Sequence, residues 1–242
     1  MFESARMAGP EKISAVLFDA AGTLIELRER VGETYARVAR EFGVDLPSGR
    51  VDDAFTRILR SARPMVFPEA ASEQIPGLER QWWHDVVRGT FAAADQTARF
   101  GDFDAYFDRL YARYSGAGSW RAVAGCRELL AELRRRGIAT GVVSNFDHRL
   151  VQILEELDLA RFFDVVVLPA SARAAKPDPR IFRVALARLA KRAAESVYVG
   201  DDPQRDAAGA RAAGLRAIDA GSLATLAELP DRLEVLSREN PA

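Results

Sequence analysis

The sequence has little cysteine and lysine, no long apolar run and no excess of charge of one sign. Its one cysteine, Cys126, excludes a disulfide within the chain and fits a reducing compartment. No apolar stretch approaches the roughly 20 residues that a membrane helix needs, and residues 1–11 lack the apolar core of a signal peptide. A net charge of -1 gives no basic field that would attract nucleic acid. These absences predict a soluble cytoplasmic protein that binds neither nucleic acid nor membranes, with residues 1–11 as a loose tail.

Lysine occurs at only three of the 242 positions, Lys12, Lys176 and Lys191, whereas arginine is abundant. Because lysines are so few, the sequence alone can exclude a reaction that requires a lysine in a segment that contains none. The hydrophobic content of 48% is normal for a globular protein. A chain of this length suits one domain, or one core domain that carries an insertion.

An apolar run that ends in a carboxylate lies near the amino terminus. Residues 13–18 have the length and the content of apolar residues that are typical of a strand buried on both faces. Asp19 then lies at the carboxyl end of that strand, where open α/β sheets bind their ligands. Gly22 permits a tight turn that directs the hydroxyl of Thr23 back toward the carboxylate. Taken alone, the same pattern also fits an ordinary turn after a strand.

The rest of the chain divides into a helical part and an alternating part. Apolar residues recur at helical intervals around 31–42, 51–59, 78–91 and 103–114, and residues 63–77, rich in proline, are expected to form a long loop. From Trp120 onward, predicted helices alternate with strands at 138–143, 164–168, 196–199 and 215–218. We therefore predict an α/β fold with a doubly wound, Rossmann-like parallel sheet. Residues 1–25 and 119–242 would form this core, and residues 26–118 an all-helical cap domain inserted after the first strand.

Polar groups follow several of the predicted strands. Parallel strands place such groups along one edge of the sheet, and the candidates here are Asp19, Thr23, Ser144, Asn145, Lys176, Asp201, Asp202 and Asp206. Several carboxylates would repel one another unless a cation lay among them, and Mg²⁺ prefers oxygen ligands of this kind while sharing a substrate phosphate. Lys176, Ser144 and Thr23 would hold other phosphate oxygens. A carboxylate beside a metal-held phosphate can attack phosphorus and form an aspartyl phosphate.

These groups resemble, in their order and spacing, the four motifs of the haloacid dehalogenase superfamily. The resemblance covers nearly the whole chain, including a helical cap after the first motif. Residues 80–83 (Arg-Gln-Trp-Trp) and 144–147 (Ser-Asn-Phe-Asp) resemble more closely still the haloacid dehalogenase-like hydrolase domain-containing proteins of the domain 3 type. The resemblance implies a hydrolase core of the predicted α/β type, Mg²⁺ as the cofactor and a small phosphorylated substrate.

The resemblance also implies a role for each candidate residue. Asp19 would be the nucleophile, and Lys176 would neutralise charge on Asp19 and on the transition state. The implied phosphoryl-binding residues are Thr23, Ser144, Asn145 (through its backbone) and Lys176. The implied metal ligands are Asp19, Ala21 (through its carbonyl) and Asp201, with Asp202 and Asp206 as further members of the metal site. Two roles stay open: Asp206 would orient either a metal-bound water or Lys176, and Asp202 is either a metal ligand or a helix N-cap.

Position 21 departs from the pattern of the superfamily's phosphatases. Those enzymes carry a second aspartate two places after the nucleophile, where this chain has Ala21. That aspartate protonates the leaving alcohol and later takes a proton from the attacking water. General acid–base help of this kind is typically worth ~10²–10⁴-fold in rate. We therefore expect slow hydrolysis of ordinary sugar phosphates, and a preference for leaving groups that need no protonation, such as those of acyl or aryl phosphates.

Several interpretations of Ala21 follow. In a phosphatase, water or a cap residue would supply the proton; His84 and His148 are candidates, although an exposed helical histidine is the commoner finding. Phosphonoacetaldehyde hydrolases share the Ala-Gly-Thr sequence but need a cap lysine, and none lies between Lys12 and Lys176. Haloacid dehalogenases carry tyrosine at this position and work without a metal, which the acidic cluster disfavours. The remaining alternative is a catalytically impaired homologue that binds a phosphorylated ligand or a protein. Nothing in the sequence indicates the substrate's identity or the oligomeric state.

Overall fold

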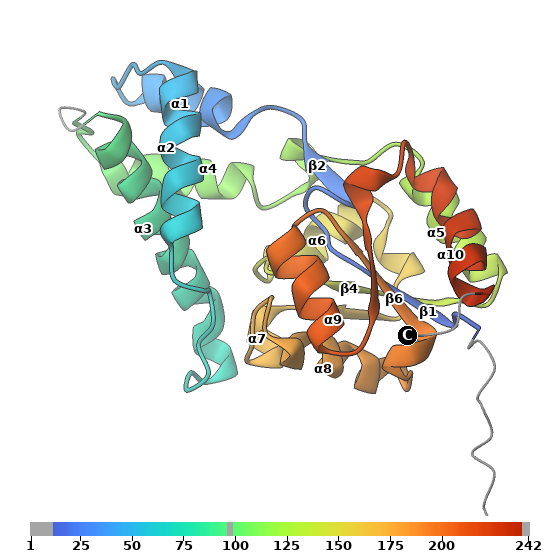
Figure 1. Ribbon diagram of the computed structural model, residues 1–242. Helices are drawn as coiled ribbons and strands as arrows, with labels where there is room; N and C mark the ends of the chain where they lie inside the picture. Colours follow the sequence, from blue (N-terminus) through green and yellow to red (C-terminus); the bar gives the residue numbers. More distant parts are fainter. Residues whose placement is uncertain (1–11, 96–98, 239–242) are drawn as a thin grey trace, which may run out of the picture.

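The computed structural model describes residues 12–95 and 99–238, and Figure 1 shows an α/β core with a group of helices beside it. The core contains a five-stranded sheet in the spatial order β5-β4-β1-β6-β7, in which all neighbours are parallel. Its strands are β1 (Ala15–Phe18), β4 (Ala139–Val143), β5 (Val165–Val167), β6 (Ser196–Gly200) and β7 (Arg216–Asp219). Because the strands are parallel, their carboxyl ends meet at one edge of the sheet.

Helices pack on both faces of this sheet. One face carries α5 (Cys126–Arg135), α6 (Arg149–Glu156) and α10 (Leu229–Arg238), and the other α8 (Pro179–Leu189) and α9 (Gly209–Ala212), with α7 (Pro169–Ala172) following β5. In the central strand β1, the fully buried Val16 and Phe18 belong to the first of these hydrophobic clusters, and Leu17 to the second. The burial of consecutive residues explains why this strand is a continuous apolar run.

Between the short strands β2 (Ile25–Leu27) and β3 (Trp120–Ala122), the described residues form a separate group of four α-helices, here called the helical insertion (Figure 1). They are α1 (Val31–Glu41), α2 (Ser48–Ser61), α3 (Ile75–Ala94) and α4 (Phe103–Arg113). The strands β2 and β3 pair antiparallel and so hold the two connections to the core side by side. The insertion has an aromatic core of its own, in which the rings of Phe91 and Tyr106 meet edge to face at 5.2 Å.

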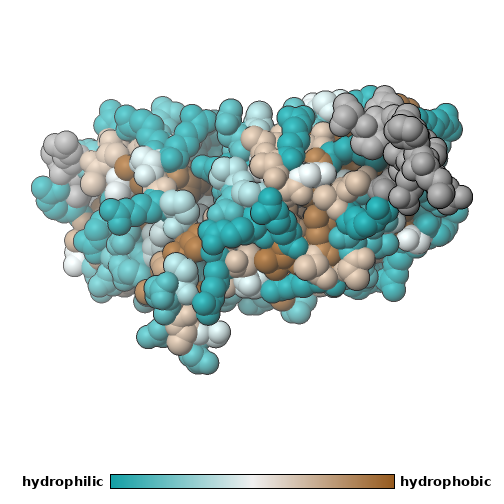
Figure 2. Space-filling model, turned by 60° about the horizontal axis from the view of Figure 1, so that its bottom comes forward, coloured by the Kyte–Doolittle hydropathy of each residue, from teal (hydrophilic) through white to brown (hydrophobic). Residues whose placement is uncertain are grey.

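The surface is mainly hydrophilic where Figure 2 shows it, and apolar residues form only small separate patches on that face. Of the helices in residues 12–95 and 99–238, none combines the length and the apolar character that crossing a membrane requires. The large apolar side chains of the insertion are therefore mostly in its interior or, as described below, around a cavity.

The predicted α/β fold with a parallel Rossmann-like sheet is confirmed, with differences in detail. The loop predicted over residues 63–77 is too long: a 3₁₀ helix forms at Ser72–Gln74 and α3 begins at Ile75. Pro76 fits there because the first turn of a helix does not use its N–H groups. Between β6 and β7, where the alternating pattern predicted a helix, the chain forms a π-helical stretch, Pro203–Ala208, followed by α9. The strands β2 and β3 and the helix α10 were not predicted. The tail expected at residues 1–11 lies outside the described residues.

Candidate active site

Asp19 lies at the carboxyl end of β1, as its position in the sequence predicted, and is 8% exposed. Its backbone N–H donates to the carbonyl of Val199 at 2.9 Å, which continues the pairing of β1 with β6. The chain then turns tightly: the N–H groups of Leu24 and Ile25 both donate to the carbonyl of Ala20. Gly22 makes this turn possible because it adopts φ +94°, where a side chain is strained. The turn fixes Asp19 at the sheet edge.

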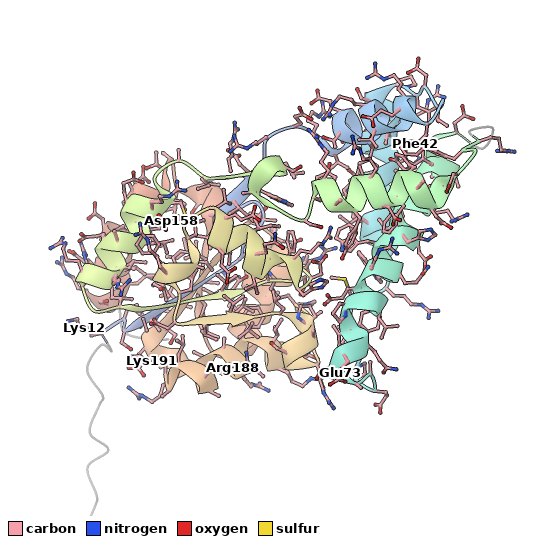
Figure 3. All side chains as sticks on the ribbon, turned by 180° about the vertical axis from the view of Figure 1, so that it is seen from behind. Lys12, Phe42, Glu73, Asp158, Arg188 and Lys191 are labelled. Atoms are coloured by element: carbon pink, nitrogen blue, oxygen red, sulfur yellow. The ribbon has the colours of Figure 1, made fainter. Side chains whose placement is uncertain are left out.

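Lys176 approaches Asp19 from the loop between α7 and α8. Its Nζ donates to Asp19 Oδ1 at 2.7 Å and to Asp206 Oδ1 at 2.5 Å. Burial alone would lower the pKa of Lys176, but the negative charges of Asp19 and Asp206 outweigh that effect and raise it. The lysine is therefore charged at neutral pH. Figure 3 shows the other two lysines, Lys12 and Lys191, at the end of the core away from the insertion.

The backbone of Lys176 is held by the side chain of Asn145, which follows β4. Asn145 Nδ2 donates to the carbonyl of Lys176 at 2.9 Å, and Asn145 Oδ1 accepts from the N–H of Lys176 at 2.7 Å. Both ends of the amide side chain are thus engaged. The side chain of Asn145 therefore positions Lys176. Only the backbone of Asn145 is left for the phosphoryl contact that was predicted for this residue.

Tyr198 completes the surroundings of Lys176, and the sequence analysis did not include it. Its hydroxyl accepts from Lys176 Nζ at 2.9 Å and lies 2.9 Å from both Asp206 Oδ1 and the carbonyl of Val143. Burial, followed by the charges of Asp19 and Asp206, raises the pKa of Tyr198 well above its usual value, so the phenol stays neutral. In the sequence, the one sign of this role was a phenolic hydroxyl between the apolar residues Val197 and Val199.

Asp206 is also fully engaged. Oδ1 accepts from Lys176, and Oδ2 accepts from the N–H of Asp202 at 3.0 Å. Of the two roles left open for this residue, the geometry therefore favours orienting Lys176. Asp202 has its own function at the start of the π-helical stretch, where Oδ1 accepts from the N–H groups of Gln204 and Arg205. Of the two roles left open for Asp202, metal ligand or helix N-cap, this geometry matches the N-cap.

Three carboxylates nevertheless lie close enough to share one ion. Oxygens of Asp19, Asp201 and Asp206 all lie within 4.8 Å of one another, whereas Asp202 does not belong to this group. Burial and, next, the charges of Asp19 and Asp206 raise the pKa of Asp201. A Cβ at Gly22 would collide with the Asp201 carboxylate, so the turn after Asp19 packs directly against it. Clustered carboxylates that repel one another are a donor set that fits Mg²⁺, and Asp19 and Asp201 would be its ligands.

The raised pKa of Asp201 gives a prediction about stability. The folded state favours the protonated acid, so the ionised form of Asp201 destabilises the metal-free fold once the pH is above that pKa. We expect Asp201→Asn to raise the Tm at neutral pH in EDTA, and to remove most of the Tm increase that Mg²⁺ gives the wild type. Thermal unfolding with and without Mg²⁺ measures both effects.

Asp53→Asn is the matched control, because Asp53 lies exposed on α2, outside the acidic group. This variant should keep the Mg²⁺ effect of the wild type. A normal Mg²⁺ effect in Asp201→Asn, together with a lower Tm in EDTA, would show that Asp201 is no metal ligand.

Thr23 and Ser144 are buried beside these groups, at 1% and 3% exposure. The hydroxyl of Thr23 has no hydrogen-bond partner among the described residues. Buried hydroxyls nearly always have a partner, so the Thr23 hydroxyl is an exception. Ser144 directly follows β4, and it lines the same cavity as Asp19 and Lys176.

That cavity has a volume of about 610 Å³ and extends from the carboxyl edge of the sheet to the helical insertion. The core contributes Asp19, Ala21, Ser144, Lys176 and Asp201. Most of the lining from the insertion is aromatic or aliphatic, including Tyr35, Phe55, Leu59, Trp82, Trp83 and Leu110. The candidate site is therefore a pocket lined by both the core and the insertion.

Neither histidine lines this cavity. His84 lies on α3, with Nε2 2.9 Å from Asp104 Oδ1. His148 lies next to α6, with Nδ1 2.5 Å from Glu79 Oε2. Both rings pair with carboxylates outside the cavity, so the structure gives neither of them the position of a proton donor.

Contacts at the side of the cavity join the insertion to the core. Trp83 of α3 donates through Nε1 to Asp147 Oδ2 at 2.5 Å, and the fully buried Asp147 also accepts from Arg149. The buried Glu79 of α3 accepts from the backbone N–H of His148 at 3.2 Å. Asp147 Oδ1 also accepts from the N–H of Arg149, the first residue of α6, at 2.9 Å.

Known proteins resemble this chain in sequence and in fold. A family model described as a haloacid dehalogenase-like hydrolase matches residues 13–214. The chain belongs to the haloacid dehalogenase-like hydrolase family. The mouse haloacid dehalogenase-like hydrolase domain-containing protein 3 is 38% identical over 213 residues, which cover 86% of this chain and 82% of that protein. Both resemblances inferred from the motifs are thus confirmed.

Two more similarities place this haloacid dehalogenase-like hydrolase among its relatives. Phosphoserine phosphatase from Thermus thermophilus is 42% identical over 90 residues, which cover 37% of this chain and 36% of that enzyme. The structure of the HAD-hydrolase YfnB from Bacillus subtilis, bound to magnesium, has a TM-score of 0.67 at 15% identity, over 93% of this chain and 100% of that one. At this identity, the second similarity shows the fold alone.

Proposed function

We propose that this haloacid dehalogenase-like hydrolase is a Mg²⁺-dependent phosphatase that acts on a small phosphorylated substrate through an aspartyl phosphate at Asp19. One observation carries the proposal: Lys176 Nζ, itself buried, contacts Asp19 Oδ1 at 2.7 Å at the floor of the cavity. A carboxylate repels a phosphate, so a site that only binds phosphate has no use for one at its floor. A carboxylate that attacks phosphorus must be there, with its charge compensated.

The reaction proceeds in two displacements. Asp19 forms a bond to phosphorus while the bond from phosphorus to the leaving oxygen breaks, and the leaving group departs with the electron pair. Water then attacks the phosphorus of the aspartyl phosphate, the bond to Asp19 breaks, and phosphate and a proton are released. Lys176 stabilises negative charge in both steps, and the unpartnered hydroxyl of Thr23 donates to a phosphoryl oxygen. Mg²⁺, held by Asp19, Asp201 and the carbonyl of Ala21, would neutralise phosphate charge.

The alanine at position 21 limits which substrates react. In the cavity lining, no histidine and no carboxylic acid beyond Asp19, Asp201, Asp202 and Asp206 is present among the described residues. Asp19 is the nucleophile in this proposal, Asp201 a metal ligand, Asp202 a helix cap and Asp206 the partner of Lys176. The leaving group must therefore depart as an anion, or take its proton from water, which favours acyl and aryl phosphates over alkyl phosphates.

A panel of acetyl phosphate, p-nitrophenyl phosphate and an alkyl phosphate, each with Mg²⁺, tests the proposal. Wild type should hydrolyse the first two and barely the third. Ala21→Asp should raise kcat for the alkyl ester by roughly 10²-fold, because it supplies the missing acid. The matched control is Ala21→Asn, which has a similar shape but no acidic proton, and should give no increase. An equal gain in both variants would exclude the explanation based on a missing proton donor.

The second candidate function is a phosphate-ligand or protein-binding homologue without turnover, which the alanine at position 21 favours. It predicts that Mg²⁺ and inorganic phosphate bind while no phosphate ester or anhydride in the panel reacts. Binding by calorimetry alongside a null result in every turnover assay would replace the phosphatase by this alternative.

A further inference from the structure

The cavity is far larger than a phosphoryl group and has two chemically different parts. The carboxylates and Lys176 lie on the side of the core, and the side of the insertion is built from aromatic and aliphatic residues such as Phe55, Leu59 and Trp82, here called the apolar wall. A phosphoryl group at Asp19 leaves most of the 610 Å³ to the rest of the substrate. The apolar wall is therefore the surface that the leaving group meets.

The two indole N–H groups of this wall already have hydrogen-bond partners. Trp82 Nε1 donates to the carbonyl of Arg63 at 2.8 Å, and Trp83 Nε1 donates to Asp147. Tyr111 and Tyr114 also line the cavity, and their buried hydroxyls have no hydrogen-bond partner among the described residues. The guanidinium of Arg149, which lines the cavity from the core, lies over the rings of Trp83 and Tyr111 at 5.6 and 3.9 Å.

Charge is equally sparse on this side. Among the described residues that line the cavity from the insertion, the charged ones are Arg60 and Arg63, and both are exposed. A sugar packed against the carbon side chains of Phe55, Leu59 and Leu110 would lose water from its hydroxyls without gaining hydrogen bonds from them. An aromatic ring would instead bury apolar surface against other rings.

We infer that the substrate's leaving group is flat, aromatic and apolar, so that the substrate class is aryl or aroyl phosphates. The inference rests on the proposed phosphatase function and adds the substrate class to it. Two independent features support this substrate class. The apolar wall favours an aromatic leaving group, and Ala21 favours a leaving oxygen that departs as an anion. Phenolates and aromatic carboxylates meet both conditions. The bond between phosphorus and the aryl oxygen breaks, the electron pair stays on that oxygen, and solvent protonates it after release.

A matched pair of substrates tests the inference. Phenyl phosphate and biphenyl-4-yl phosphate have leaving phenols of nearly the same acidity, and they differ by one apolar ring. With Mg²⁺, we expect kcat/KM of the wild type to be about tenfold or more higher for the biphenylyl ester, because the second ring is buried against the apolar wall. Equal values for the two esters would overturn the inference and leave the phosphatase proposal intact. No turnover of either ester or of acetyl phosphate would overturn the phosphatase proposal itself.

Leu59→Gln makes the wall locally polar, at a half-buried position in the last turn of α2. It should lower the biphenylyl-to-phenyl ratio of kcat/KM at least about threefold. Leu78→Gln is the matched control, since Leu78 is an exposed residue of α3 that does not line the cavity, and its ratio should equal that of the wild type. Leu59→Ala is the second variant if Leu59→Gln folds poorly by circular dichroism. A ratio unchanged in the folded Leu59 variant would show that the wall does not contact the leaving group.

Discussion

Replacing Asp19 with asparagine is expected to lower kcat for acetyl phosphate on the order of 10³-fold or more, which is the largest effect on activity in this account. Asparagine keeps the shape of the side chain, but its amide does not attack phosphorus to form the acyl phosphate. Steady-state phosphate release with Mg²⁺ measures the loss. Circular dichroism and Tm should show a folded protein, because the substitution adds no bulk at the end of β1.

Asp202→Asn is the useful control for this variant, since Asp202 carries the same charge at the same edge but caps the π-helical stretch through Oδ1. Asparagine also caps well, so its fold should be retained, and its turnover should fall far less than that of Asp19→Asn. If Asp19→Asn hydrolyses acetyl phosphate at the rate of the wild type, covalent catalysis by Asp19 is excluded.

Replacing Lys176 with methionine should have the largest effect on stability. The lysine is buried and compensates two carboxylates, Asp19 and Asp206, at 2.7 and 2.5 Å. Removing one partner of a buried ion pair typically costs about 3–5 kcal/mol, because it leaves charge buried and unpaired. We expect a loss of unfolding free energy of that order in EDTA, measured by urea unfolding, together with loss of turnover.

The pH dependence of the stability difference between wild type and Lys176→Met distinguishes the loss of ion pairs from a simple loss of packing. Because the pKa of Lys176 is raised in the folded protein, its contribution is fully present below the ordinary lysine pKa and is lost as the pH rises through the folded value. The difference between wild type and Lys176→Met should therefore be constant near neutral pH and shrink only at strongly alkaline pH. The exposed Lys12 gives the matched control: Lys12→Met should leave stability and turnover unchanged. Equal stability of Lys176→Met and Lys12→Met would mean that the buried ion pairs contribute nothing to the free energy of unfolding.

Local sequence patterns predicted the parallel core well for a physical reason. A strand buried on both faces must be a continuous apolar run, so β1 and β6 were recognisable from composition alone. The same reasoning placed Asp19 and Asp201 at one edge, because parallel strands share it. The short strands β2 and β3 have three residues each, and their pairing joins residues about a hundred positions apart. No periodicity can develop over three residues, so this ribbon was not predictable from pattern.

Residues that support the site were harder to predict than residues that face it. Asn145 was selected for its place after a strand, yet its side chain holds the backbone of Lys176. Tyr198 was not selected, because a tyrosine in an apolar strand is indistinguishable from a core residue until its hydroxyl is seen on Lys176. The role of Glu79 likewise became clear only from its contact with His148, which joins the insertion to the core. Such roles depend on tertiary contacts, which spacing along one chain does not reveal.

The most direct measurement of the central claim is the chemical trapping of the intermediate. The wild type is mixed with acetyl phosphate and Mg²⁺, quenched in acid within the first turnover, digested, and analysed by mass spectrometry. The account predicts one phosphoryl group on the peptide that contains Asp19, and none in Asp19→Asn treated identically. Turnover with the label on another residue, or with no labelled peptide at any quench time, would contradict it.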